Sequence, residues 1–195
     1  MNARERILDG AAEVMRSRGL ANTTTKEIAK AAGLSEAMLY KVFQDKVDLF
    51  LGVLTERLPR VSVFSDGLAA GRGTVLASLR RLATEILSFY LESFPIAASV
   101  FSDPQLLSRH RLALGERGAG PERLVEAVAA YLSAEQRAGR VAATARPEVV
   151  AELLVGACLH HAFLACFAQE TISPARIRRF ASNIVMVLEP ALRPV

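Results

Sequence analysis

A pattern between residues 24 and 35 predicts two short helices joined by a tight turn. Thr24 is followed three positions later by Glu27, which is the capping-box spacing that begins a helix. Gly33 stands where this helix has to end, because glycine adopts the left-handed backbone conformation at little cost. Ser35 suits the N-cap of a second helix. The spacing therefore predicts helices over about 25–32 and 36–43, the helix-turn-helix layout.

The second of these helices is expected to have one buried and one exposed face. Leu39 and Phe43 are four positions apart, so they share a face and should pack against Ile28 and the preceding helix. A small side chain, a cation and a phenol on the opposite face could enter a major groove, although a plain helical hairpin with a solvated face has the same spacing. The residues expected on the exposed face are Ala37, Met38, Tyr40 and Lys41.

Helical spacing continues along the rest of the chain and strand signals are nearly absent, which predicts an all-α fold of about nine helices. Pro95 is expected to break a helix, residues 61–72 to form a connection, and residues 103–120 to begin helical after Pro104 and end among glycines. The remaining helices are expected at about 3–18, from Lys46 to before Pro59, and at 74–93, 96–102, 121–137, 147–168 and 174–189.

Composition excludes several other classes of protein. With 51% apolar and 23% charged residues over 195 positions, the chain can fill a core and does not resemble a disordered one. Charged residues follow Met1, so no secretory signal is expected, and the apolar stretch 153–168 is shorter than the roughly 20 residues of a membrane helix. Two cysteines make no disulfide framework. These features predict a soluble cytoplasmic protein without a membrane partner.

The lysines of the chain are concentrated in the helix-turn-helix segment and just after it. The net charge of +4 is too small to indicate nucleic-acid binding by itself. All four lysines, however, lie between residues 26 and 46, and every other basic residue is an arginine.

Residues 4–50 carry a series of features in order and without a gap: Arg6-Ile7-Leu8, Ala11-Ala12, Gly19, Thr24-Thr25, Ile28-Ala29, Ala32-Gly33-Leu34-Ser35, Leu39-Tyr40, Phe43, Lys46 and Leu49. With these features the stretch resembles the DNA-binding domain of TetR-family transcriptional regulators. The resemblance implies an N-terminal DNA-binding domain over residues 1–46 and a helical effector-binding and dimerisation domain over residues 47–195. It also implies a repressor that binds a palindromic operator as a homodimer and is released by a small-molecule effector.

The resemblance also implies which residues bind DNA. Thr25, Lys26, Tyr40 and Lys46 would contact the phosphate backbone, and Lys26 could also reach a base edge. The side chains that read sequence would be Ala37, Met38 and Lys41, with the lysine donating to guanine acceptors and the other two touching thymine methyl groups. The complete predicted DNA-binding set is Thr25, Lys26, Ser35, Glu36, Ala37, Met38, Tyr40, Lys41 and Lys46.

Two positions depart from the family pattern. Val42 stands where many members have an aromatic residue or histidine that contacts phosphate, so that contact is expected to be missing. Glu36 suits the helix dipole but would repel phosphate, and it could instead accept a hydrogen bond from a cytosine amino group. We therefore expect modest affinity with a steep salt dependence.

The last two helices are predicted to form a homodimer. Both are apolar on more than one side, and a bare apolar patch of that size would aggregate unless a second copy covered it. The family resemblance implies the same arrangement, and two recognition helices about 34 Å apart would match one turn of a palindromic site. The predicted interface residues are Val150, Leu154, His161, Ile177, Phe180, Ile184 and Leu188.

The middle helices are expected to enclose a pocket for a small, largely apolar effector, which the resemblance implies. Ser93, Ser99 and His110 are candidate polar side chains that could hydrogen-bond the effector. Residues at this spacing also occur as ordinary core. The predicted pocket residues are Leu87, Tyr90, Phe94, Phe101, His110 and Phe163.

The sequence leaves three alternatives. Cys158 and His161 are three positions apart and could share a face in a metal- or redox-responsive regulator, although further ligands would have to come from elsewhere. An enzyme is not expected, because the sequence contains no nucleophile elbow, phosphate loop or helical pair of metal ligands, and we expect neither a catalytic residue nor a cofactor. An activator, or a factor without an effector, is compatible with the same fold.

Overall fold

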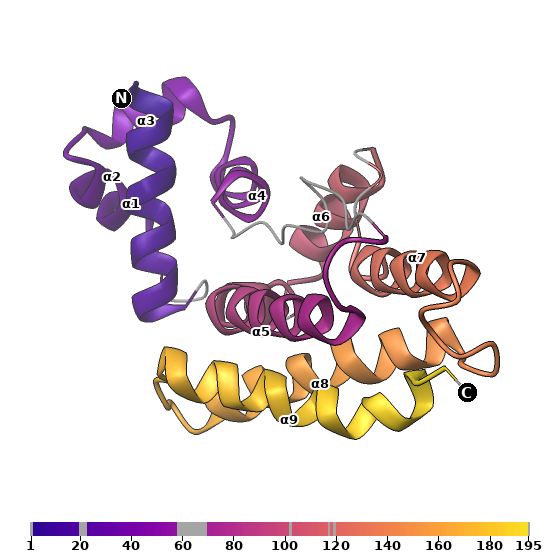
Figure 1. Cartoon of the computed structure of the whole chain (residues 1–195). Coiled ribbons are helices and arrows are strands. Elements are labelled where there is room, and N and C mark those ends of the chain that lie inside the picture. Colours follow the sequence, from indigo (N-terminus) through magenta and orange to yellow (C-terminus); the bar gives the residue numbers. More distant parts are fainter. Residues whose placement is uncertain are drawn as a thin grey trace. The chain divides into compact units, whose positions relative to one another are not determined.

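The computed structural model describes residues 2–19, 23–57, 70–101, 103–116, 118 and 120–194. These residues form nine α-helices and no strand, so the predicted all-α fold is confirmed (Figure 1). Most of the connection expected at residues 61–72 lies outside the described part of the chain. The helices are α1 (Ala3–Arg18), α2 (Thr25–Ala32), α3 (Glu36–Val42), α4 (Lys46–Glu56), α5 (Val75–Val100), α6 (Pro104–Glu116), α7 (Arg123–Arg137), α8 (Pro147–Phe167) and α9 (Pro174–Leu192).

The chain divides into two compact units. The N-terminal unit comprises Met1–Pro59 and Glu92–Gly120, and the C-terminal unit comprises Arg60–Leu91 and Pro121–Val195. Helix α5 therefore contributes its first part to the C-terminal unit and its last part to the N-terminal unit. The functional division expected at residue 46 stays a prediction.

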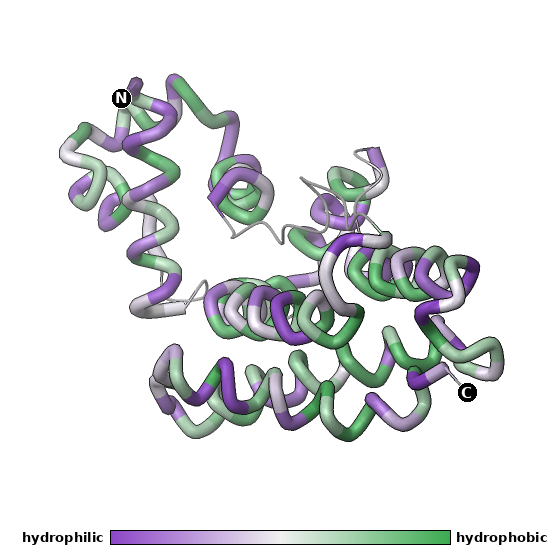
Figure 2. Tube along the Cα trace, viewed as in Figure 1, coloured by the Kyte–Doolittle hydropathy of each residue, from purple (hydrophilic) through white to green (hydrophobic). Residues whose placement is uncertain are grey.

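The N-terminal unit has its own apolar core, to which α1, α2, α3, α4 and α6 all contribute. Hydrophobic and hydrophilic residues alternate along α1 at helical spacing, so that one side of the helix is buried (Figure 2). Gly10 allows α1 and α2 to approach closely, because a Cβ at this position would lie 2.8 Å from the backbone nitrogen of Ala32. The largest fully buried side chains of this core include Ile7, Leu8, Met15, Ile28, Leu39, Phe43, Leu49 and Ile96.

The C-terminal unit packs the first part of α5 with α7, α8 and α9 around a second core. Helices α8 and α9 lie side by side in this unit (Figure 1). A buried ion pair joins α7 to the following turn, with Arg140 Nη2 2.6 Å from Glu135 Oε1. The same Oε1 accepts a hydrogen bond from the Gly71 amide at 3.2 Å, so this carboxylate also fixes the chain just before α5.

The helix break expected at Pro95 is wrong, because α5 runs without interruption to Val100. Proline removes one backbone donor and crowds the preceding turn, at a cost of about 3 kcal/mol inside a helix. Ile96 and Val100, which follow the proline, are almost fully buried. Burial of two large aliphatic side chains contributes about 3–6 kcal/mol, enough to offset that cost. The sequence after Pro104 is helical to Glu116, as its beginning predicted.

Helix α8, with 21 residues, is long and apolar enough to cross a membrane by length and composition, whereas the sequence analysis considered only the shorter apolar stretch 153–168. One side of it forms core of the C-terminal unit, where Leu154 and Cys158 are fully buried. The other side leaves large apolar residues exposed, including Leu153, Phe163, Leu164 and Phe167.

Candidate DNA-binding surface

The predicted helix-turn-helix is present with the expected local chemistry. Thr24 Oγ1 accepts a hydrogen bond from the Glu27 amide at 3.2 Å, and the Glu27 carboxylate accepts one from the Thr24 amide at 3.2 Å, which completes the capping box of α2. Gly33 ends α2 with a φ of 64° in the left-handed region. Ser35 Oγ then accepts from the Met38 amide at 3.2 Å and caps α3.

Arg6 on α1 donates hydrogen bonds to the turn that joins α2 to α3. Its Nη2 donates to the carbonyl oxygens of Ala32 at 2.8 Å and Gly33 at 3.1 Å. These contacts place a cation at the C-terminal end of α2, where the helix dipole favours positive charge. The sequence placed Arg6 only within the family pattern, because the contact spans 26 positions and depends on how α1 crosses α2.

The two faces of α3 lie as predicted. Leu39 is fully buried and Phe43 is 1% exposed, and both pack into the core of the N-terminal unit with Ile28. On the opposite face, Tyr40 is 50% exposed and Met38 is 36% exposed. Ala37 and Lys41 are exposed as well. The structure thus presents the four residues that sequence analysis assigned to an exposed face.

Three predicted DNA contacts meet in one hydrogen-bonded cluster. The Thr25 hydroxyl donates to the Glu36 carboxylate across the turn between α2 and α3. The Tyr40 hydroxyl lies 3.4 Å from Thr25 Oγ1 and donates to it. Sequence analysis treated these residues separately, because neither hydrogen bond follows a helical or capping spacing.

Lys46 begins α4 between the N-cap residue Asp45 and the aromatic ring of Phe50. Its Nζ lies 5.1 Å from the centroid of the Phe50 ring, within cation–π distance. Asp45 caps the helix by accepting from the Asp48 amide at 2.7 Å, and Arg109 of α6 donates to the Asp45 carboxylate at 3.0 Å. The Asp48 amide, and then Arg109, hold the pKa of Asp45 below its ordinary value.

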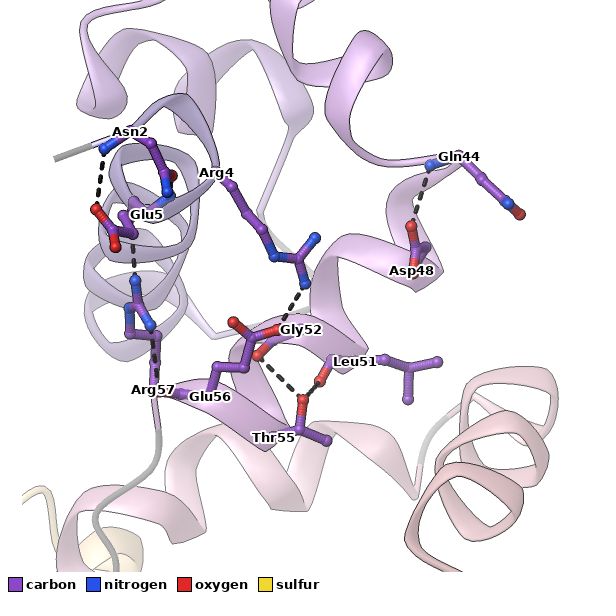
Figure 3. Close-up of polar contacts among 10 residues, drawn as sticks. All are labelled: Asn2, Arg4, Glu5, Gln44, Asp48, Leu51, Gly52, Thr55, Glu56 and Arg57. Carbon is purple, nitrogen blue, oxygen red and sulfur yellow. Dashed lines mark hydrogen bonds and ion pairs between the residues drawn. The ribbon is translucent and has the colours of Figure 1, made fainter. Parts of the chain in front are cut away.

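Two ion pairs join α1 to the C-terminal end of α4, and Figure 3 shows the one between Arg4 and Glu56. Arg4 Nη2 lies 2.6 Å from Glu56 Oε1, and the Arg4 guanidinium also lies 4.7 Å from the centroid of the Phe43 ring. Arg57 Nε lies 2.6 Å from Asp9 Oδ1. Sequence reasoning missed these pairs, because they join positions about fifty residues apart with no local signal.

Comparison with known proteins identifies the family. Residues 7–53 match the model of bacterial regulatory proteins of the tetR family, and residues 77–191 match the C-terminal domain of AefR-like transcriptional repressors. The chain belongs to the TetR family. It is therefore a DNA-binding transcriptional regulator, and TetR-family regulators are transcription factors and not enzymes.

Individual relatives agree with this assignment. The HTH-type transcriptional regulator YdgC of Bacillus subtilis is 27% identical over 165 residues, which cover 82% of this chain and 79% of YdgC. The nucleoid occlusion factor SlmA of Vibrio cholerae is 42% identical over 55 residues, which are 28% of each chain.

Solved structures share the fold. A TetR-family regulator from Mesorhizobium loti has a TM-score of 0.75 and 23% identity, with 96% of each chain covered. FadR from Bacillus subtilis, solved with stearoyl-CoA, has a TM-score of 0.69 and 14% identity, with 97% of this chain and 99% of FadR covered. At these identities the likeness concerns the fold alone.

The predicted effector-pocket residues are divided between the two units. Leu87 is fully buried and Tyr90 half-buried in the C-terminal unit, where burial raises the pKa of Tyr90 to about 12. Phe163 is 44% exposed on α8. In the N-terminal unit, Phe101 is 74% exposed and Phe94 is partly buried. The pocket stays a prediction.

The polar anchors proposed for this pocket differ in their surroundings. His110 is partly buried, its pKa is lowered by burial, and its Nδ1 has no hydrogen-bond partner among the described residues. Ser93 is 3% exposed, and the side chain of Ser99 lies outside the described part of the structure. A surface hollow of about 360 Å³ in the C-terminal unit lies at the start of α5 and is lined by none of the predicted pocket residues.

Some of the predicted interface residues lie on the buried sides of α8 and α9, and the others are partly exposed. Val150, Leu154 and Leu188 are at most 6% exposed within their own chain, so they offer a partner little surface. His161 stacks on Phe180 with ring centroids 4.5 Å apart, and both are partly exposed. Ile177 and Ile184 are also partly exposed. The predicted dimer interface stays a prediction.

The alternative sensor built on Cys158 gains no support from the geometry. The Cys158 thiol is fully buried, lies 3.6 Å from the Ala83 carbonyl oxygen, and has its pKa raised to about 12 by burial. A reactive or metal-binding cysteine needs an accessible thiolate. Within the described ranges, no three histidine, cysteine or acidic side chains are grouped to hold a metal ion.

Proposed function

We propose that this TetR-family protein is a cytoplasmic repressor that binds a palindromic operator as a homodimer and is released by a small, largely apolar effector. The observation that carries the DNA-binding role is the exposed face of α3, which is held by two side-chain caps and a left-handed glycine turn on a rigid core. A short helix fixed in this way can present side chains to base edges in a major groove. The match to an AefR-like repressor domain supports the repressor mode.

Side chains around α3 divide into two groups by their expected DNA partners. Lys26 and Lys46 would neutralise phosphates, and Thr25 and Tyr40 would donate hydroxyl hydrogen bonds to phosphate oxygens. Residues on the exposed face would read bases, with Lys41 donating to guanine. The other residues of the predicted DNA-binding set are Ser35, Glu36, Ala37 and Met38.

An exposed apolar face on α8 and α9 supports the homodimer. Phe167 is 80% exposed, Val187 70% and Met186 59%, and these are large apolar side chains on neighbouring helices of one unit. Large apolar side chains exposed in this way are typical of a surface that another chain covers. A second copy would also supply a second recognition helix, which would bind the other half of a palindromic site.

The effector is proposed by chemical class. The predicted pocket residues are mostly aromatic or aliphatic, which favours an apolar ligand. FadR, a protein of the same fold, was solved with stearoyl-CoA, so a long-chain acyl group is the first apolar ligand to test, both as the free fatty acid and as its CoA ester. Release requires only that the ligand prefer the conformation with low DNA affinity, with a coupling of about 1–3 kcal/mol.

The experiment is selection of bound duplexes from a random pool, followed by fluorescence anisotropy on the selected site at several salt concentrations. Lys46→Ala should weaken binding to every duplex and make the salt dependence shallower, because one phosphate contact is lost. Lys41→Ala should relax the preference at one base pair in each half-site. Failure to enrich any sequence, or equal effects of the two variants on random DNA, would contradict the proposed roles.

A further inference from the structure

The cluster of Thr25, Glu36 and Tyr40 uses its hydroxyl protons internally. Tyr40 donates to Thr25 Oγ1, and Thr25 donates to the Glu36 carboxylate, so the chain of hydrogen bonds ends on an anion. Each hydroxyl carries a single proton. Both protons are therefore directed within the protein in this structure.

A DNA phosphate has to compete for these protons. Phosphate oxygens accept hydrogen bonds and cannot donate them, so a phosphate reaching Thr25 or Tyr40 needs the same protons that the cluster uses. The carboxylate of Glu36 accepts with a full negative charge, and hydrogen bonds to charged acceptors are roughly twice as strong as neutral ones. The phosphate would thus replace one anionic acceptor by another and gain little.

Apart from the positive end of the α3 dipole, no described group offsets the charge of this carboxylate. Among the described residues, no basic side chain lies within ion-pair distance of Glu36, and the residue is exposed on the same surface as Tyr40. The Thr25 hydroxyl is accordingly the contact that fixes the carboxylate in place.

We propose that Glu36 is an internal competitor for backbone phosphate that suppresses sequence-independent DNA binding. The carboxylate leaves Thr25 when a base edge offers it an amino donor, such as cytosine N4 or adenine N6 in the major groove. On such a site the two hydroxyls become free to bind phosphate, so that reading a base and binding the backbone are coupled. Glu36 then determines specificity, and this inference rests on the proposed DNA-binding function.

The test uses the full-length chain and a random-sequence duplex, with binding followed by fluorescence anisotropy at low salt. Glu36→Gln keeps the shape of the side chain but accepts only a neutral hydrogen bond, and we expect it to bind random DNA about tenfold more tightly, which corresponds to about 1.4 kcal/mol. Glu36→Asp is the matched control for charge, because it keeps the carboxylate but is one methylene too short to hold the same contact with Thr25. We expect Glu36→Asp also to bind random DNA more tightly than the wild type.

A double-mutant cycle with Thr25→Val separates the hydrogen bond from simple charge repulsion. In the valine background, Glu36→Gln should tighten binding by clearly less than in the wild type, because no hydroxyl remains to be released. If Glu36→Asp binds like the wild type, or if the gain from Glu36→Gln is the same in both backgrounds, the carboxylate acts only by repulsion and the inference is overturned. Should Thr25→Val fail to fold, the comparison of Glu36→Gln with Glu36→Asp decides alone.

Two different results distinguish a failure of DNA binding from a failure of the role proposed for Glu36. A folded wild-type protein that binds no duplex at low salt would overturn the proposed function itself. A wild type that binds and selects an operator, while Glu36→Gln leaves random binding unchanged, would retain the function and remove only the role of Glu36.

Discussion

The close approach of α1 and α2 at Gly10 predicts a cost for adding one methyl group. A Cβ at position 10 would lie 2.8 Å from Ala32 N and 3.2 Å from both the carbonyl carbon and the Cβ of Ala31. Ordinary carbon contacts are about 3.5–4.0 Å, so the helices would have to separate by roughly 0.5–1 Å. Two of the three atoms belong to the backbone and cannot rotate away.

The magnitude follows from two opposing effects of Gly10→Ala. Overpacking costs about 1–3 kcal/mol, and we take the upper end because backbone atoms are involved. Alanine regains about 1 kcal/mol of helix propensity over glycine. The net loss of stability in the N-terminal unit is therefore about 2 kcal/mol.

Hydrogen exchange followed by mass spectrometry is the appropriate assay, because the chain has two units and a single unfolding free energy does not describe both. Peptides from α1 and α2 should exchange roughly thirtyfold faster in Gly10→Ala, which is the ratio for 2 kcal/mol. Gly115→Ala is the matched control, since Gly115 lies in α6 of the same unit and no atom lies within 4 Å of its added Cβ. It should be neutral or stabilising by about 0.5–1 kcal/mol. Equal protection in the two variants would refute the reasoning.

Three further perturbations test other contacts. Glu135→Gln should lower the temperature at which the C-terminal unit unfolds at neutral pH, because Arg140 loses its charged partner. The hydrogen bonds from Arg140 are the largest cause that holds the pKa of Glu135 below its ordinary 4.5, so the pair stabilises the folded state above pH 4.5. The wild type should lose this stabilisation as the pH falls through the lowered pKa. The Glu135→Gln variant has no carboxylate here and should show no such loss. The Cys158 thiol, with a pKa of about 12, should react with a thiol reagent at about pH 8 only as fast as the unit opens, and immediate labelling of the native protein would contradict its burial. Arg109→Gln should cost less than about 1 kcal/mol, because the pair with Asp45 is exposed, and an NMR titration should show the pKa of Asp45 still lowered by its capping amide.

The helix-turn-helix could be predicted because its determinants are local. Thr24, Glu27, Gly33 and Ser35 act on amides within three or four positions, so the one-dimensional spacing contains the geometry. The buried side of α3 followed from Leu39 and its neighbour one turn later for the same reason. These are the parts that the structure confirms residue by residue.

Other features depend on contacts between distant segments. The continuity of α5 through Pro95 comes from burial of the residues beyond it, which overrides the local penalty. The hydrogen bond from Thr25 to Glu36 crosses the turn, and Arg6 reaches the Gly33 carbonyl from another helix. Sequence patterns identify such residues as polar and exposed but contain no information on which of them meet.

The ring beneath Lys46 has a consequence for how strongly that lysine can hold DNA. A free lysine side chain loses up to about 2 kcal/mol of rotamer entropy when it is fixed. The Phe50 ring, 5.1 Å from Nζ, has already restricted this freedom before any duplex arrives. If Lys46 binds a phosphate as proposed, less of the attraction is lost in ordering the side chain, so Lys46 would contribute more than the same cation on a mobile side chain.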